Sequence, residues 1–147
     1  MDEAKFLDSS VFLHAFLKPK RGLRPEERVV KEASKKILKG VEKGESVVTT
    51  VVHLSEIANI IESRSGLSTS IGMLAWLFSL ENLEILDVYS WDYEKALSIS
   101  QEYSVSINDA LAYIKMKEKG VKIIYSFDKH FRNFKDIVVL PTFKGSR

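Results

Sequence analysis

Four acidic residues stand where short apolar runs of the chain give way to helical patterns. They are Asp8, Glu56, Asp109 and Asp128. If the apolar runs are strands of one parallel sheet, all four carboxylates can meet at the carboxyl edge of that sheet. Carboxylates gathered there repel one another unless a hard divalent cation lies among them, and oxygen ligands of this kind suit Mg²⁺ or Mn²⁺. The spacing therefore predicts a metal site suited to phosphodiester chemistry.

Phosphodiester hydrolysis explains why such a set of residues is useful. The reaction needs an activated water, a neutralised phosphate and a stabilised leaving oxygen. One or two carboxylates can hold each Mg²⁺ ion and leave several of its water ligands in place. Two ions about 4 Å apart can serve both the entering and the leaving oxygen, so that no histidine is needed as a base.

Each carboxylate also has a purely structural interpretation. Asp8 and Asp128 can each cap the turn that follows a strand. Ser106 and Asp109 have the spacing of a capping box, and an acidic residue in the first turn also suits the helix dipole. Glu56 lies beside the apolar stripe of its helix, where the alternative is a hydrogen-bonded carboxylate at the edge of the core. Spacing alone leaves both interpretations open.

The other residues that commonly carry chemistry fall in no recognisable pattern. The three histidines, His14, His53 and His130, do not have the spacing of metal ligands, and we expect packing or surface roles for them. The chain has no cysteine, which excludes disulfides, thiolate–zinc sites and a cysteine nucleophile. It has no glycine-rich phosphate loop and no nucleophile elbow, so neither a nucleotide cofactor nor a serine hydrolase is expected.

The charge of the chain suits a polyanionic substrate. It has 22 Lys and Arg against 20 Asp and Glu, a formal net charge of +2. Setting the four carboxylates aside leaves 22 basic against 16 (20 minus 4) acidic residues, a mildly basic body around an acidic pocket. The alternative is an ordinary solvated surface. The acidic start, Met1-Asp2-Glu3, and the lack of a long apolar segment predict a cytoplasmic protein without a membrane span.

Short apolar runs alternate with helical spacings along the whole chain. Strands are expected at residues 6–7, 46–50, 83–88, 121–126 and 137–140. Helices are expected at residues 11–16, 25–43, 51–65, 68–80, 90–102 and 106–119, with a short helical turn at 128–134. Ser68 or Thr69 can cap the fourth of these helices. This alternation predicts an α/β fold, a three-layer α/β/α arrangement with a mainly parallel central sheet, and one domain spanning residues 1–147.

Four short motifs, in order along nearly the whole chain, resemble those of PIN-domain ribonucleases, and most closely the VapC-like toxin type. They are Phe6-Leu7-Asp8-Ser9-Ser10-Val11-Phe12, Leu54-Ser55-Glu56-Ile57, Ile107-Asn108-Asp109-Ala110-Leu111-Ala112 and Ile124-Tyr125-Ser126-Phe127-Asp128-Lys129-His130-Phe131. The Asp-Ala-Leu and Ser-x-Asp-x-x-Phe pieces are the most specific. The resemblance implies a parallel sheet with helices on both faces. It also implies Mg²⁺- or Mn²⁺-dependent endonucleolytic cleavage of RNA by metal-activated water.

The resemblance also implies a role for each acidic residue. Asp8 and Asp109 match the principal metal ligands of the family. Glu56 matches a ligand or a group that orients water, and Asp128 matches a ligand to a second or looser ion. All four are therefore expected to take part in both metal binding and catalysis.

Supporting residues and partners follow from the same resemblance. Ser126 matches the hydroxyl that supports the cluster, and Ser9 or Ser10 can do the same beside Asp8. The toxins of the family commonly dimerise and are neutralised by a small antitoxin that fills the acidic groove. The basic stretch Lys18–Arg28 is long for such a toxin and could grip RNA or a protein partner, although a solvated loop and helix start is the alternative.

Three other functions are compatible with the sequence. A PIN nuclease of RNA maturation or decay has the same site without the toxin role. A phosphoacceptor receiver domain also gathers acids at a sheet edge, but it usually has adjacent acids after the first strand, where this chain has the single Asp8. The last is an RNA-binding module without catalysis, and the intact set of four carboxylates speaks against it.

Overall fold

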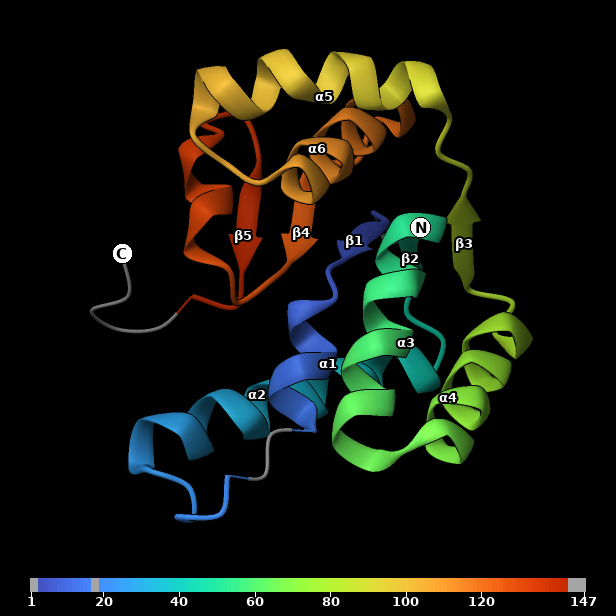
Figure 1. Cartoon of the computed structure of the whole chain (residues 1–147), viewed down its shortest axis with the longest axis vertical. Helices are drawn as coiled ribbons and strands as arrows, with labels where there is room; N and C mark the ends of the chain where they lie inside the picture. Colours follow the sequence, from blue (N-terminus) through green and yellow to red (C-terminus); the bar gives the residue numbers. More distant parts are fainter. Residues whose placement is uncertain (1–2, 17–18, 143–147) are drawn as a thin grey trace.

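A computed structural model describes residues 3–16 and 19–142 of the chain (Figure 1). Its strands are β1 (Lys5–Leu7), β2 (Val47–Thr50), β3 (Leu83–Leu86), β4 (Ile123–Tyr125) and β5 (Val138–Leu140). Its α-helices are α1 (Ser10–Ala15), α2 (Pro25–Glu42), α3 (Val51–Ser65), α4 (Leu67–Ser79), α5 (Ser90–Tyr103) and α6 (Ile107–Lys119). A 3-10 helical turn, η1 (Lys129–Asn133), follows β4.

The strands pair in parallel in the order β3-β2-β1-β4-β5, so β1 occupies the centre of the sheet. In the register, Lys5 lies opposite Val47 of β2 on one side and Ile123 of β4 on the other. Because all these pairings are parallel, the carboxyl ends of the strands share one edge. The segments that follow β1 and β4 leave that edge together, and the Asp8 backbone N–H donates to the Tyr125 carbonyl at 3.1 Å.

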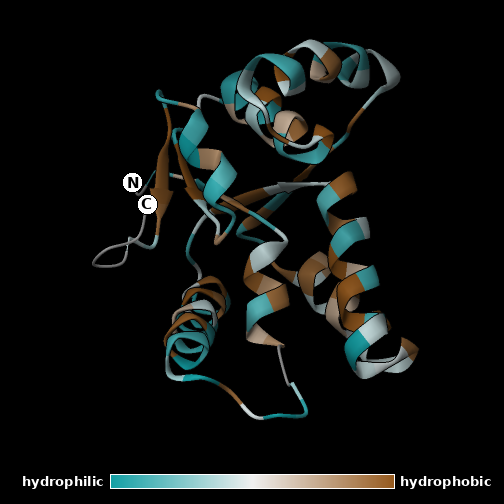
Figure 2. Ribbon diagram, turned by 60° about the vertical axis from the view of Figure 1, so that its left-hand side comes forward, coloured by the Kyte–Doolittle hydropathy of each residue, from teal (hydrophilic) through white to brown (hydrophobic). Residues whose placement is uncertain are grey.

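The sheet separates two layers of helices with separate cores. Successive side chains of a strand point to opposite faces. Phe6 and Val48 pack toward α5, α6 and η1, whereas Leu7 and Val47 pack toward α1, α2, α3 and α4 (Figure 1). Figure 2 shows mainly hydrophobic strands between helices that carry both hydrophobic and hydrophilic residues. The predicted α/β/α arrangement with a parallel sheet is confirmed.

The predicted elements are all present, with shifts at their ends. Helix α4 begins at Leu67, directly after the glycine that ends α3, so the expected cap at Ser68 or Thr69 is wrong. Gly66 adopts φ 90°, which lets the chain turn from one helix into the next without a connecting loop. Strand β4 begins only at Ile123, because the Val121 backbone N–H still donates to the end of α6.

The basic stretch mostly surrounds the start of α2. Lys18 lies outside the described residues. Arg21 donates to both carboxylate oxygens of Glu27, at 2.8 and 2.7 Å, and the same carboxylate accepts the Arg24 backbone N–H at 2.9 Å. This exposed network fixes the beginning of the helix. A role of the stretch toward RNA or a partner stays a prediction. No helix in the described parts of the chain is both long enough and apolar enough to cross a bilayer.

Candidate active site at the carboxyl edge of the sheet

Asp8 follows the central strand and is almost fully buried, with 4% of its surface exposed. Its Oδ2 atom accepts the hydroxyl of Ser10 at 2.6 Å and that of Ser126 at 2.7 Å. The two hydroxyl oxygens lie 3.2 Å apart. The N-cap position of α1 is Ser9, which makes no capping bond with its side chain, whereas Asp8 Oδ2 also accepts the Ser10 backbone N–H at 3.4 Å, so a long capping bond accompanies the two hydroxyl bonds. One carboxylate oxygen is thus held in place by hydroxyls from two segments that are adjacent only in the folded chain.

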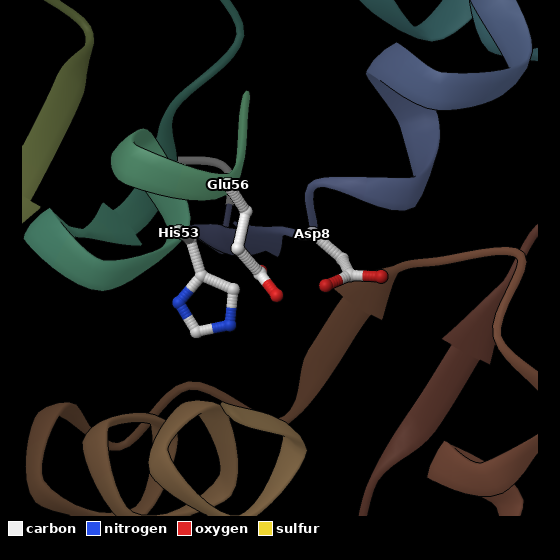
Figure 3. A group of neighbouring side chains, drawn as sticks. All are labelled: Asp8, His53 and Glu56. Carbon is white, nitrogen blue, oxygen red and sulfur yellow. The ribbon is translucent and has the colours of Figure 1, made fainter. Parts of the chain in front are cut away.

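Thr50 starts α3 directly at the end of β2. Its hydroxyl accepts the backbone N–H groups of Val52 and His53, both at 3.1 Å, which satisfies the first turn of the helix. Without a connecting loop, the first two turns of α3 stay at the carboxyl edge of the sheet. Two side chains of these turns, His53 and Glu56, therefore lie beside Asp8 (Figure 3).

His53 is a buried, neutral side chain at the back of this site. It is 1% exposed and packs edge-on against the Phe6 ring, with the ring centroids 5.0 Å apart. Burial lowers its pKa, although the charges of Asp8 and Glu56 act in the other direction. Because the Thr50 oxygen already accepts two N–H groups, its own proton is directed to His53 Nδ1, at 2.7 Å. The neutral ring then carries its proton on Nε2, a buried atom that has no hydrogen-bond partner among the described residues.

Glu56 is held by the residue before α1 and by a residue of α6. Its Oε1 atom accepts the hydroxyl of Ser9 at 2.9 Å, and its Oε2 atom accepts the side-chain amide of Asn108 at 2.8 Å. Ser9 therefore supports Glu56, whereas Ser10 supports Asp8. These bonds fit either interpretation of Glu56, as a hydrogen-bonded carboxylate at the edge of the core or as part of a site.

Asp109 lies in the first turn of α6 with 6% of its surface exposed. The hydroxyl of Ser106 accepts its backbone N–H at 3.1 Å, as in a capping box. The reciprocal bond is absent: Asp109 Oδ2 is buried and has no hydrogen-bond partner among the described residues. A buried carboxylate oxygen without a partner is costly, so helix capping does not explain this residue.

Asp128 sits at the start of η1, after β4. Its carboxylate accepts the backbone N–H of His130 at 2.9 Å and lies 2.8 Å from the ring nitrogen Nδ1 of the same residue. The capping role proposed for Asp128 is therefore real. Its own backbone N–H donates to the Ser126 hydroxyl at 3.0 Å, so Ser126 joins Asp128 to Asp8.

The acidic side chains form two adjoining groups. One ligand atom each from Asp8, His53 and Glu56 lie within 4.8 Å of one another, and the same holds for Asp109, Asp128 and His130. Burial raises the pKa of Asp109 to about 7, helped by the charges of Asp128 and Asp8. Burial likewise raises the pKa of Asp8, against the opposing effects of the nearby His53 and of the hydrogen bonds from Ser10 and Ser126.

A divalent cation fits this donor set. Among the described residues, no lysine or arginine forms an ion pair with Asp8 or Asp109. The carboxylate oxygens are hard donors. The Oδ2 atom of Asp109 has no hydrogen-bond partner among the described residues, and a bound cation would give it a partner. The identity of such an ion does not follow from these atoms.

The structure brings all the predicted site residues to one edge of the sheet. They are Asp8, Glu56, Asp109, Asp128 and Ser126. His53 and Asn108 were missed as members of the site, since His53 was expected only to pack or to lie at the surface. Thr50 at the end of a strand, three residues before His53 and six before Glu56, was the available signal. The catalytic and metal-binding roles stay predictions.

The other two histidines, His14 and His130, lie in different surroundings. His14 packs edge-on against Phe127, with the ring centroids 5.2 Å apart, in line with the packing role expected for it. His130 is exposed, as expected, but its ring contacts Asp128 at the rim of the site.

Comparison with known families matches residues 5–137 to the PIN domain. This chain belongs to the PIN domain family. Its fold is similar to that of VapC20 from Mycobacterium tuberculosis, described as a toxin that cleaves the sarcin-ricin loop. That comparison has 21% identity and a TM-score of 0.71, and it covers 94% of this chain and 100% of the other. The recognition from the four motifs is confirmed, and the receiver-domain alternative is removed.

Two toxin–antitoxin assemblies contain similar chains. One is from Klebsiella pneumoniae, at 12% identity and a TM-score of 0.62, covering 92% of this chain and 96% of the other. The second is VapBC2 from Rickettsia felis, bound to a DNA fragment from its promoter. It has 13% identity and a TM-score of 0.61, covering 93% of this chain and 97% of the other. At these identities the likeness concerns the fold. No match was found among curated proteins.

Proposed function

We propose that the protein is a metal-dependent endoribonuclease that cleaves RNA phosphodiester bonds. The observation that carries the proposal is the pair of buried carboxylates, Asp8 and Asp109, whose pKa values are raised by burial and which form no ion pair with a lysine or arginine of the described residues. Structural carboxylates are normally paired or fully hydrogen-bonded. Membership of the PIN domain family supports the same function.

Each residue of the site has its own role in binding the metal or in supporting a ligand. Asp8 and Asp109 are the principal ligands of Mg²⁺ or Mn²⁺, Glu56 is a ligand or orients water, and Asp128 holds a second or looser ion. When bound, the cation supplies an activated water and neutralises the phosphate. Ser126 holds the Asp8 carboxylate in one orientation through the bond at 2.7 Å.

The decisive measurement is cleavage of an RNA oligonucleotide with mapped ends, with Mn²⁺ and with excess EDTA. Asp8→Asn and Asp109→Asn are expected to lower the rate by at least about 100-fold while the protein stays folded, because each removes a charged ligand. Asp87→Asn, an exposed position outside the site, is the matched control and should cleave as the unmodified protein does. Full activity in EDTA, or in either site variant, would refute the proposal.

We also propose that the nuclease is a toxin neutralised by an antitoxin. The similarity in fold to VapC20 and to chains of two toxin–antitoxin assemblies supports this. A groove of about 630 Å³ between α1, α2 and α4 also supports it, since apolar side chains such as Phe16, Leu38 and Trp76 line it. Its charged lining is mainly basic, with Lys31, Lys35 and Lys39 against the single carboxylate of Glu42. Such a groove suits an amphipathic segment with acidic residues beside its apolar face.

The toxin role has its own test, because a nuclease of RNA maturation or decay would share the site. Expression should arrest growth, and Asp8→Asn should abolish the arrest. Co-expression of the product of a neighbouring gene should restore growth and yield a complex. Lys35→Glu with Lys39→Glu should weaken that complex without affecting RNA cleavage. A protein that cleaves RNA but never slows growth would instead fit RNA maturation or decay.

A homodimer is the third part of the proposal. Helix α4 exposes a stripe of large apolar side chains, Leu67, Ile71 and Phe78, at 60%, 61% and 65% exposure. These positions share one face of the helix, and Trp76, which lines the groove, lies on another. A second copy of the chain that covers the stripe would remove this apolar surface from water.

A further inference from the structure

A cleft of about 370 Å³ opens beside the acidic site, and the residue roles described so far make no use of it. Glu56 and Asn108 line it on the side of the site, so the cleft is continuous with the carboxylate cluster. Its volume lies within the range of about 300–1,000 Å³ that is typical of sites for small ligands. A group bound there would lie next to whatever the carboxylates act on.

One wall of the cleft consists of polar side chains of α3. Ser55 and Asn59 flank Glu56 on the same face of the helix, because residues three and four apart are neighbours. The Asn59 amide has no hydrogen-bond partner within the part of the chain that the structure describes, and both of its ends are free to bind a ligand. An amide offers two donors and one acceptor, which matches the edge of a nucleobase.

The facing wall is aromatic. Tyr93, in the first turn of α5, lines the cleft and is 42% exposed. The aromatic side chains nearest in sequence are engaged elsewhere: Tyr89 stacks on Trp91, with the ring centroids 4.6 Å apart, and Tyr103 packs against Phe134. Within the described residues the Tyr93 side chain makes neither a ring contact nor a hydrogen bond, so its ring face is available for stacking.

We infer that this cleft binds one nucleobase of the RNA substrate, stacked on Tyr93 and read along its edge by Asn59. The inference rests on the proposed function, since it places the base beside the phosphodiester that the carboxylates would cut. A neutral base fits better than a phosphate, because Glu56 brings negative charge to the cleft and no lysine or arginine lines it. The amide and hydroxyl groups also favour a base over an apolar segment of a protein.

The test uses RNA oligonucleotides that carry one abasic residue, moved position by position past the cut. For the unmodified protein in Mn²⁺, one abasic position should raise KM about 5- to 150-fold, the range expected for one base–aromatic stack. Tyr93→Ala should raise KM for the intact RNA and lose this discrimination, whereas Tyr93→Phe should keep it. Leu97→Ala removes an exposed apolar side chain one turn further along α5 and should leave KM unchanged.

A measurement of RNA binding without cleavage distinguishes the base-site inference from the proposed nuclease function. Fluorescence anisotropy in EDTA, with the same oligonucleotides, should show the same abasic position weakening the complex of the unmodified protein but not that of Tyr93→Ala. If the protein cuts no RNA, the proposed function fails, and this binding result alone decides the base site. Cleavage and binding that no abasic position affects would overturn the base site and leave the nuclease intact. A fall in oligomer size in both Tyr93→Ala and Leu97→Ala would mean that this face binds protein, which also overturns the inference.

Discussion

The hydroxyl of Ser126 connects two acidic residues that are 120 positions apart in the sequence. It donates to Asp8 Oδ2 at 2.7 Å and accepts the backbone N–H of Asp128 at 3.0 Å. A buried hydroxyl in this position fixes the orientation of one carboxylate and the start of the turn that carries the other. In metal sites, such supporting hydrogen bonds commonly matter as much as the ligands themselves.

Replacing Ser126 by alanine should weaken the site without unfolding the protein. Asp8 Oδ2 would keep the bond from Ser10, and the Asp128 backbone N–H would lose its acceptor. We expect the Mn²⁺ concentration at half-maximal activity to rise about 10- to 100-fold. A Mn²⁺ titration of the cleavage rate measures this. Ser98→Ala, on the exposed side of α5, is the matched control, and an unchanged titration curve for Ser126→Ala would show that the hydroxyl is dispensable.

Asp109 should make the metal-free protein less stable as the pH rises. In the fold its pKa is about 7, whereas in the unfolded chain it is close to 4. The folded state therefore holds an extra proton between these two values, so the contribution of Asp109 to stability is full below about pH 4 and is lost as the pH rises to about 7. Each pKa unit between the folded and the unfolded value corresponds to about 1.4 kcal/mol in the free energy of unfolding.

Thermal melts of the metal-free protein between pH 5 and pH 8 test this. The melting temperature should fall toward pH 8 and recover when Mn²⁺ is added. Asp109→Asn should melt higher than the unmodified protein at pH 8 and similarly at pH 5, because the amide has no charge to bury. Equal melting of the two proteins at pH 8 would contradict the raised pKa.

The site could be predicted from the sequence only in part, and the limit is physical. Asp8, Asp109 and Asp128 follow strands or open a helix, and these positions lie at a sheet edge whatever the neighbours. His53 and Asn108 have no such marker, because their place in the site depends on tertiary hydrogen bonds. Which serine supports which carboxylate depends on the angle at which α1 leaves the sheet, and no local pattern encodes that angle.

At the scale of the elements, the short connection between β2 and α3 determines where the site can form. Thr50 is both the last residue of the strand and the N-cap of the helix. Short apolar runs and the helical spacing between them were enough to predict the fold, since both follow from side-chain burial. The start of α4 was mispredicted because serine and threonine are good caps, whereas here a glycine turn brings α3 directly into α4.

Two glycines of this region should respond in opposite ways to alanine. Gly66 lies between α3 and α4 at φ 90°, a conformation that strains any side chain, although no atom lies within 4 Å of an added Cβ. Gly72 lies inside α4 with the same free space and helical backbone. Gly66→Ala should lower the free energy of unfolding by about 1 kcal/mol or more, and Gly72→Ala should raise it by about 0.5–1 kcal/mol.

Urea denaturation of the two variants side by side measures this difference. Each serves as the other's control, since both add one methyl group to open space next to the same helix. Equal effects of the same sign would mean that packing, and not backbone conformation, governs the turn between α3 and α4.

At the scale of the whole molecule, the exposed stripe on α4 should hold two copies together. Phe78→Lys should give a monomer in sedimentation experiments at concentrations where the unmodified protein is a dimer, because a buried lysine without a partner opposes association. Thr69→Lys places the same charge on another face of α4 and should leave the dimer intact. A monomeric unmodified protein, or a dimer unaffected by Phe78→Lys, would rule out this interface.

The central place of β1 has a consequence for how the protein is made. The strand beside Asp8, β4, and its hydroxyl donor Ser126 are translated more than a hundred residues after Asp8 itself. Under the proposed function, a nascent chain cannot assemble a working nuclease until both have left the ribosome. The topology would thus delay cleavage of cellular RNA until the second half of the domain has been synthesised.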